Sequence, residues 1–310
     1  MGYKNLGLAD DEFPTPDKLP FIPYHRESRR IEGMVTLTVN HIAKPFQTEK
    51  PLYRTGIAVG DYPIDHHHAE YAGSVPIGEF PKVPSFNVPL GALIPKDVSH
   101  FIVAEKSISV TNVVNGTTRL QPVVLLIGQA AGVLAAIAAR ENVSPQSVSV
   151  RRVQSVLLKY DAYIMPYFDV KRDNPHFRAI QRIGATGILR GVGEPHAWAN
   201  RTWFYPDSTV NSLDFKFNID NFYNLKRLPM GYEESAQISV ERAIYQIAAI
   251  QNQKVNDLFL EQMKEKWTSL GLKNYDVKRP ITRAELAVLL DATLNPFEKT
   301  IGFDGQLRKE

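Results

Sequence analysis

The sequence predicts an α+β fold, in which a part with strands and helices is followed by a mainly α-helical domain. Three observations support this prediction. Short apolar runs of strand type lie in the first third of the chain, and one long apolar helix follows them. From Pro175 onward, apolar residues recur at helical spacing. We therefore expect one domain over residues 1–172 and a helical domain over 173–310, because the pattern changes near residues 169–174.

The composition is typical of a folded chain with a sizeable core. Of 310 residues, 44% are hydrophobic and 22% are charged, close to the average for globular proteins. The formal charge is only +3, and no basic cluster carries interleaved aromatic residues, so we expect no nucleic-acid partner. Cysteine is absent. This excludes disulfides, thiol nucleophiles and cysteine-ligated metals.

The first predicted domain opens with an irregular, proline-rich arm over residues 1–24. Alternating or continuous apolar residues then predict strands at 34–39, 55–59 and 100–104. A polar loop over 107–122 leads into the strongest helix signal of the chain, at 123–140, and a shorter helix is expected at 153–160.

The apolar run Val123–Ala139 is at the short limit for crossing a bilayer and has Gln129 near its middle. Its glycines and alanines suit a helix packed tightly inside a protein, so we expect no membrane span. The N-terminus lacks the apolar segment of a signal peptide. Localisation stays open, and a periplasmic or extracellular location is expected if a signal peptide has been removed.

The second predicted domain consists of amphipathic helices. Asn174 and Pro175 mark the start of a helix over 176–183, and further helices are expected at 239–250, 256–270 and 282–294. Thr282 and Glu285 have the spacing of a capping box. Two segments ending in Gly-Ile-Leu and Gly-Leu each lead to a later helix, which indicates a degenerate duplication of a helix–loop–helix unit.

The helix over 123–140 carries the first candidate for chemistry, the small residues Gly128–Gly132. We expect these residues close to the start of the helix, where unpaired N–H groups and the positive dipole end favour a phosphate or a ring oxygen. Small side chains also let a flat ligand approach the helix. A core helix that packs through its glycines is the alternative explanation.

A second candidate is the segment Tyr62–His68, which contains three consecutive histidines. Alternate residues of an extended segment share a face, so Asp65 and His67 are expected to point the same way. The carboxylate could then hold the imidazole in one tautomer for proton transfer. We expect no metal, because three consecutive histidines reach one ion only through a tight turn. A polar surface loop is the alternative.

A third candidate is the basic run Arg26–Arg30, which precedes the first predicted strand. The guanidinium of Arg26 could clamp a carboxylate or a phosphate. A solvated sheet edge or a structural Arg–Glu pair explains the run equally well.

Taken in order, HRESRRIEG, AVGDYPIDHHH and the segment from FNVPLGALIP to IGQAAGVLAAIAA resemble the C-terminal half of an FAD-dependent oxidoreductase family often labelled xanthan-lyase-like. The resemblance spans roughly residues 10–165 and implies the flavin- and substrate-side half of that fold, with a mixed sheet. It implies FAD as cofactor, lined by Gly128, Gln129, Ala130, Ala131 and Gly132, with Arg119, Gln121 and Pro122 beside the isoalloxazine ring. It also implies that Asp65 and His67 face the substrate, with His67 as proton acceptor and Arg26 and Arg29 as anchors.

The sequence departs from that family in one respect. Such enzymes bind the ADP half of FAD with a strand–GxGxxG–helix unit, and the printed sequence contains none. Gly191–Gly193 does not serve, because we predict no strand before it and no helix after it. We therefore expect this chain to hold FAD weakly or not at all, with an N-terminal half or a second chain supplying the missing contacts.

The resemblance implies oxidation of a carbohydrate or similar polar substrate by hydride transfer to the flavin. The tail, through WFYPDSTV and ITRAELAVLL, resembles degenerate S-layer-homology units, which attach proteins to cell-wall polysaccharide. The alternative function is therefore a non-catalytic glycan- or cell-wall-binding or scaffold protein that retains an incomplete flavoprotein module. A polysaccharide lyase, with Tyr62, His67 and Arg26 in its site, is a third option.

Overall fold

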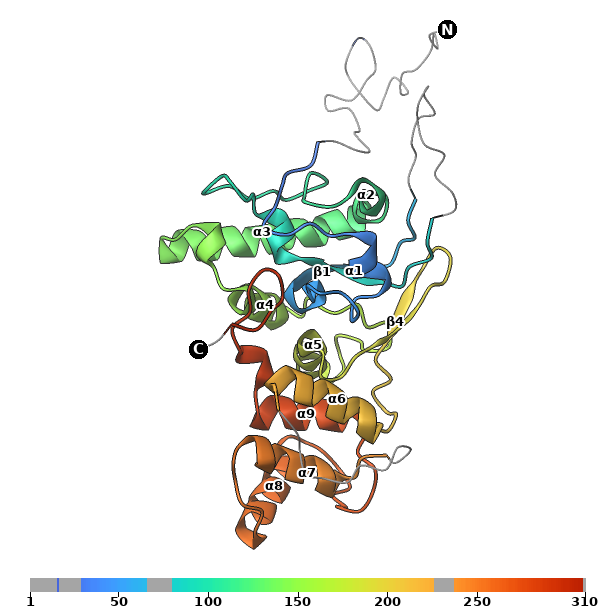
Figure 1. Cartoon of the computed structure of the whole chain (residues 1–310), viewed down its shortest axis with the longest axis vertical. Helices are drawn as coiled ribbons and strands as arrows, with labels where there is room; N and C mark the ends of the chain where they lie inside the picture. The colour runs from blue at the N-terminus through green and yellow to red at the C-terminus, as the bar shows by residue number, and fades with distance from the viewer. Residues whose placement is uncertain (1–15, 17–28, 66–79, 226–236, 309–310) are drawn as a thin grey trace.

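The computed structural model describes residue 16 and residues 29–65, 80–225 and 237–308. Figure 1 shows the strands and α1–α4 in one part and α6–α9 in another, with α5 between them. The elements are α1 (Val39–Ala43), η1 (Leu52–Thr55), β1 (Gly56–Gly60), β2 (Phe86–Pro89), η2 (Leu90–Leu93), α2 (Asn112–Thr118), α3 (Gln121–Glu141), η3 (Pro145–Ser147), α4 (Val150–Lys159), α5 (Phe177–Thr186), β3 (Val192–Glu194), β4 (Arg201–Trp203), α6 (Ser212–Tyr223), α7 (Val240–Ile250), α8 (Asp257–Ser269), α9 (Arg283–Thr293) and η4 (Pro296–Glu298).

The α+β class is confirmed, but the sheets are small. Strand β1 pairs with β2, and β3 pairs with β4, both in antiparallel register. Within the described ranges no larger mixed sheet forms. The prediction of a strand at 55–59 agrees with β1, whose buried face packs beneath α3.

Two predicted strands are wrong. Residues 33–37 run extended between two other segments, with single bridges from Gly33 to Pro95 and from Leu37 to Val110, and the chain then enters α1. The run 100–104 forms no strand, because His100 adopts a left-handed φ of 55° and Phe101 is 51% exposed. Both runs make single backbone hydrogen bonds to neighbouring segments, such as the one from Val103 N–H to the Leu93 carbonyl at 2.9 Å. These bonds do not follow one another in the regular pattern of a ladder, so neither run is a strand.

The predicted polar loop over 107–122 is also wrong in part, because it contains the helix α2. Helix α3 begins two residues earlier than predicted, with Pro122 in its first turn, where proline costs no hydrogen bond. Asn142 ends the helix in the left-handed conformation.

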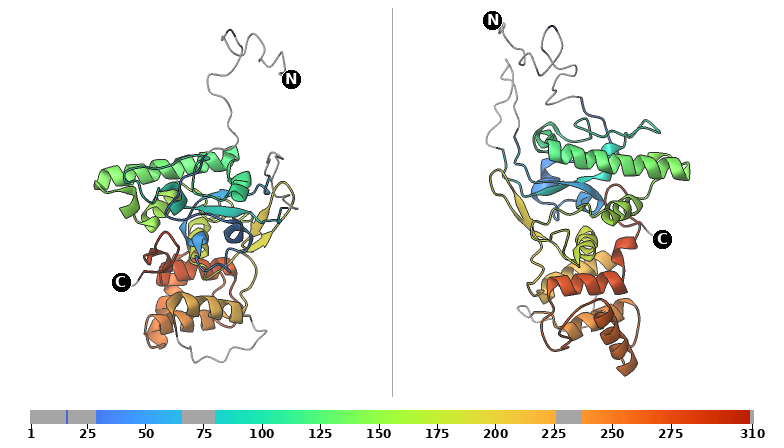
Figure 2. Two further views of the ribbon diagram at one scale, coloured as in Figure 1. Left: turned by 45° about the horizontal axis from the view of Figure 1, so that its top comes forward. Right: turned by 180° about the vertical axis from the view of Figure 1, so that it is seen from behind.

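Helix α3 is long and apolar enough to cross a membrane by length and composition alone, with a mean hydropathy of 2.1 in its most apolar window. One face of the helix belongs to the protein core, where Ile127 and Leu134 have no exposed surface. The other face is exposed, and Leu125 is 73% accessible. Figure 2 shows α3 along the outer edge of its part from two further directions.

The predicted C-terminal helices are confirmed as α5, α7, α8 and α9. The Thr282–Glu285 capping box forms at the start of α9. Sequence analysis did not predict α6 or the β3–β4 hairpin. Gly191 lies directly before β3, and Gly193 lies within it. Bridges from Asn211 to Gln237 and from Ser239 to Pro280 bring the starts of α6, α7 and α9 together.

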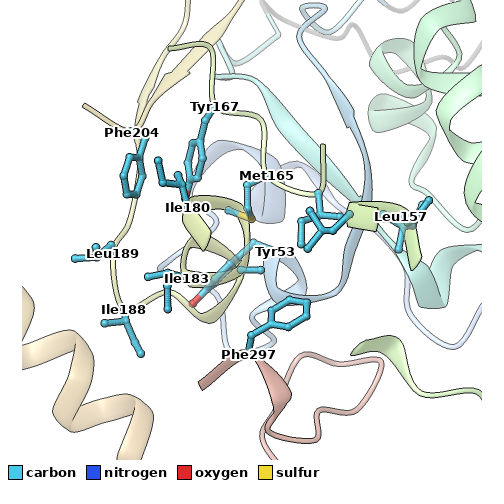
Figure 3. Packing of buried hydrophobic residues seen from close by; sticks show 14 of the residues in the cluster. Tyr53, Leu157, Met165, Tyr167, Ile180, Ile183, Ile188, Leu189, Phe204 and Phe297 are labelled. Carbon is cyan, nitrogen blue, oxygen red and sulfur yellow. The ribbon is translucent and has the colours of Figure 1, made fainter. Parts of the chain in front are cut away.

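One cluster of buried side chains continues across the predicted boundary at residues 172 and 173. Figure 3 shows Tyr53, Ile183 and Phe297, from three distant segments, gathered around α5. The C-terminal segment returns to lie near α4 (Figure 1), where the Arg54 guanidinium donates to the Gly305 carbonyl. The two predicted domains therefore share a core.

Candidate functional site

The candidate site is built where α2 meets the segment that follows β1. The Thr117 hydroxyl donates to the carbonyl of Tyr62 at 2.5 Å. The guanidinium of Arg119 donates from Nη2 to the carbonyl of Asp65 at 2.8 Å and lies 3.7 Å from its carboxylate. Arg119 is buried. These contacts hold the Tyr62–Asp65 segment against the end of α2. They bring together Asp65 and Arg119, two of the site residues that the sequence predicted.

Helix α2 presents a row of polar side chains with atoms that lack partners among the described residues. Thr111, Asn115 and Arg119 lie four residues apart, on one face of the helix. Among the described residues, no hydrogen-bond partner exists for the Thr111 hydroxyl, for either amide atom of Asn115 or for Nε of Arg119. Asn115 has no exposed surface. A buried amide without a partner costs about 1–3 kcal/mol, so this face is suited to a polar ligand.

A cavity of about 320 Å³ lies beside the start of α3. Pro122, one of the predicted site residues, lines it together with Asp61 and Asn200. Asn200 ties the hairpin to the site, because its N–H donates to the Asp61 carbonyl at 2.8 Å. Its own amide Nδ2 is buried without a partner in the described part of the chain. This cavity can therefore hold a ligand with a hydrogen-bond acceptor.

Tyr167 separates this cavity from a second one of about 280 Å³ and lines both. Its hydroxyl has no partner among the described residues, and burial raises the pKa of that hydroxyl. Asn115, Asn200 and Tyr167 were missed by sequence analysis. Of these three, only Asn115 carried a signal in the sequence. It lies four residues before Arg119, so the two share a face when the segment is helical, but the segment was predicted to be a loop.

Gly128–Gly132 does not lie at the helix start, which corrects that prediction. The segment begins about two turns into α3, where backbone N–H groups are used inside the helix. Ala130 and Ala131 are buried in the core, whereas Gln129 and Gly132 are exposed. A Cβ added at Gly128 or Gly132 would meet nothing within 4 Å. Packing in the described chain therefore does not require glycine at either position.

Several predicted site residues lie outside the described residues. These are Arg26, His66, His67 and His68. Arg29 is described and exposed, and Gln121 is exposed in the first turn of α3. In the ranges that the structure describes, no group of three potential metal ligands occurs.

A sequence model of the family described as FAD dependent oxidoreductase matches residues 2–157, about half of the chain. The chain belongs to the FAD-dependent oxidoreductase family. Its cofactor is accordingly FAD. No curated protein and no solved structure matches the chain. The match includes α2, α3 and the Tyr62–Asp65 segment. Asn200 and Tyr167, which line the neighbouring cavities, lie after the matched residues.

The polar face of α2 fits the flavin. The pyrimidine edge of an isoalloxazine ring alternates carbonyl acceptors with an N–H donor. The unpaired amide of Asn115 supplies a donor and an acceptor, the Thr111 hydroxyl supplies either, and Arg119 supplies a charged donor. The Thr111 hydroxyl, the Asn115 amide and Nε of Arg119 lack partners in the described chain, whereas Nη2 of Arg119 is bound to Asp65. A flavin edge could therefore pair with these unpartnered atoms without breaking an existing bond.

Proposed function

We propose that residues 1–172 form the flavin-ring and substrate side of an oxidoreductase that oxidises a polar alcohol, such as a carbohydrate. The unpaired polar face of α2, joined to Asp65 through Arg119, carries this proposal. The ADP half of FAD would be held by an N-terminal half or a second chain. We also propose, from the resemblance of its motifs, that the chain belongs to the xanthan-lyase-like group of this family.

FAD, when bound, accepts a hydride from a substrate C–H bond. Asn115 and Thr111 bind the polar edge of the ring, and Arg119 places a positive charge beside it. Arg119 also holds Asp65 in position. In this proposal Asp65 would orient His67, which would take the proton of the substrate hydroxyl, and Arg26 would anchor the substrate; both His67 and Arg26 lie outside the described residues.

The cofactor step is tested by titrating the full chain with FAD and following the flavin absorption band after desalting. Asn115→Leu should lower FAD retention about tenfold, because it removes two hydrogen bonds to the ring edge. Asn112→Leu is the matched control, since Asn112 lies on the exposed side of the same helix. Equal retention by both variants would contradict the proposed role of α2. Without any retention by the wild-type chain, the titration is repeated with the chain that supplies the ADP-binding unit.

The proton step is tested on the flavin-loaded enzyme. His67→Ala should slow flavin reduction by substrate about 100-fold or more, as expected when a general base is lost. An unchanged reduction rate would show that His67 is not the base.

A partly exposed aromatic cluster favours a second function, glycan binding by the tail. The rings of Trp203 and Tyr205 are stacked, with centroids 5.9 Å apart, and Phe168 meets Trp203 edge-on at 5.1 Å. Such aromatic faces suit the apolar face of a sugar ring. This agrees with the S-layer-homology resemblance of the segment that contains both rings.

Retention on purified cell-wall polysaccharide tests this second function. Trp203→Ala should abolish retention, whereas Trp198→Ala, at an exposed ring outside the cluster, should not. Retention that is the same in both variants would exclude the cluster as the binding surface.

A further inference from the structure

A polar cavity of about 640 Å³ lies away from the flavin site, between the start of α4, helix α5 and the segment after η4. Its lining consists of three arginines, two glutamates and three hydroxyl residues, namely Arg151, Arg152, Arg182, Glu141, Glu298, Ser149, Ser155 and Thr300. These residues come from both sides of the boundary at 172 and 173. None of them belongs to the candidate flavin site.

Arg151 is the unusual member of this lining, because it is only 3% exposed. Its Nη1 donates to the side chain of Gln154 at 2.8 Å and to the carbonyl of Arg54 at 3.2 Å. Its Nε and Nη2 have no hydrogen-bond partner among the described residues. These two atoms form one edge of the guanidinium, which is the edge that takes both oxygens of a carboxylate or phosphate.

The neighbouring charges leave Arg151 without a carboxylate of its own. Arg182 is bound to Asp291 at 2.7 Å and to Glu298 at 3.2 Å. Arg152 lies 3.7 Å from Glu141. Burial, with the nearby charge of Arg54, lowers the pKa of Arg151 to about 9. A buried charge with free donors is costly, and an anion in contact with it relieves that cost.

The start of α4 also favours an anion in this cavity. Ser149 is the N-cap residue, but its side chain makes no capping hydrogen bond. The first N–H groups of this ten-residue helix therefore lack a side-chain acceptor, and the helix dipole is positive at this end. Ser149 and Arg151 both line the cavity, so the helix start and the guanidinium lie beside the same space.

We propose that this cavity binds an oxyanion, the phosphate or carboxylate group of a small molecule, on the free edge of Arg151. The ligand lies between α4 of the family-matched part and α5 of the helical part. Its binding therefore stabilises the contact between the two predicted domains. This site is independent of the flavin proposal.

The proposal is tested by calorimetric titration and by thermal unfolding of the full chain. Inorganic phosphate and acetate are compared with chloride at equal ionic strength, so that general screening is separated from binding. Phosphate or acetate should bind and raise the melting temperature above that in chloride. The stronger of the two identifies whether the natural group is a phosphate or a carboxylate.

Three variants locate the binding. Arg151→Lys should weaken binding about tenfold or more, because lysine keeps a charge but loses the two-donor edge. Arg152→Gln should weaken it several-fold, and because Arg152 is exposed this variant should fold even where Arg151→Lys does not. Arg178→Gln is the control, since Arg178 is exposed and paired with Asp161 outside the cavity.

Three outcomes overturn the proposal. The first is a wild-type chain that responds to phosphate and acetate no more than to chloride. The second is binding that Arg152→Gln leaves unchanged, and the third is binding that Arg178→Gln weakens as much as the cavity variants do.

Discussion

At the residue scale, single polar side chains hold distant segments together. The amide of Asn87 donates to the carbonyls of Tyr53 and Ile164 at 2.8 and 3.0 Å. The fully buried Gln181 accepts from the N–H groups of Ile164 and Met165 and donates to the carbonyl of Met165. Gln181 satisfies backbone groups of a segment outside any helix or strand, so it replaces regular secondary structure there. Asn87 does the same for the Ile164 carbonyl and adds a second donor to the Tyr53 carbonyl, which already accepts from Gly56 at the end of η1.

Gln181→Ala should lower the free energy of unfolding by about 2–4 kcal/mol, because three backbone groups lose their partner and a cavity forms. Urea unfolding followed by circular dichroism measures the change. Gln251→Ala is the control, since Gln251 is exposed and makes one bond to the carbonyl of Thr293. Equal effects of the two substitutions would contradict this account of Gln181.

At the scale of elements, the two sides of α3 have different requirements. Ile127 and Leu134 on one side are fixed by the core. On the other side, Gly128 and Gly132 have open space around them, although glycine weakens a helix interior. The contrast is sharp with Gly184 in α5, where an added Cβ would overlap the Tyr167 hydroxyl.

Gly132→Ala should therefore raise the free energy of unfolding by about 0.5–1 kcal/mol, the usual difference in helix propensity. Gly184→Ala should lower it, because Tyr167 is buried and has little room to move. Thermal unfolding of both variants checks the prediction. A loss of stability in Gly132→Ala would mean that this face packs against a part of the chain beyond the described residues.

The capping box of α9 should make stability depend on pH. Burial raises the pKa of the Glu285 carboxyl. Hydrogen bonds from Arg279 and Thr282 lower it by more than burial raises it, so the pKa lies below its ordinary value of 4.5. A carboxyl whose pKa is lower in the folded than in the unfolded protein stabilises the fold at every pH above the unfolded pKa. This stabilisation is lost as the pH falls through the folded pKa.

Wild-type protein should thus lose more stability than Glu285→Gln when the pH falls from about 6 to about 3. Urea unfolding across this range measures the difference. Glu261→Gln serves as control, because Glu261 is exposed and pairs with Lys264 at only 3.5 Å. If both variants follow the wild-type curve, the Glu285 carboxylate does not stabilise α9.

At the scale of the whole molecule, the shared core argues against two independent folding units. Phe297 is fully buried and lies under the guanidinium groups of Arg151 and Arg182, at 4.3 and 4.7 Å. It thereby joins the C-terminal segment to α4 and α5. The boundary at residues 172 and 173 remains a prediction about sequence pattern, since residues on both sides belong to one buried cluster.

The chain should accordingly unfold in one transition. All three tryptophans lie after residue 172, so fluorescence reports the helical part, while hydrogen exchange in α3 reports the other part. Phe297→Ala should shift both signals together and cost about 3–5 kcal/mol. A shift confined to fluorescence would show that the two parts unfold separately.

Local patterns predicted a large share of the fold. Helices α3, α7, α8 and α9 follow from apolar spacing and caps, because these depend on residues a few positions apart. Helix α2 was missed, since its polar sequence has no apolar stripe. The run at 100–104 has strand composition, but it is held by a backbone bond from Val103 to Leu93 rather than by a ladder, and composition does not reveal this difference.

The sequence by itself determined the α+β class, the helical tail and the flavoprotein character, because motif order and periodicity are properties of the chain. Through the family resemblance it also led to the prediction that Asp65 and Arg119 belong to the flavin and substrate site. Only the tertiary structure decided that these two meet across 54 positions, that Gly128–Gly132 lies within α3, and that Arg151 keeps a free edge. Burial and pairing between distant residues depend on how the whole chain packs, and a local sequence pattern does not predict them.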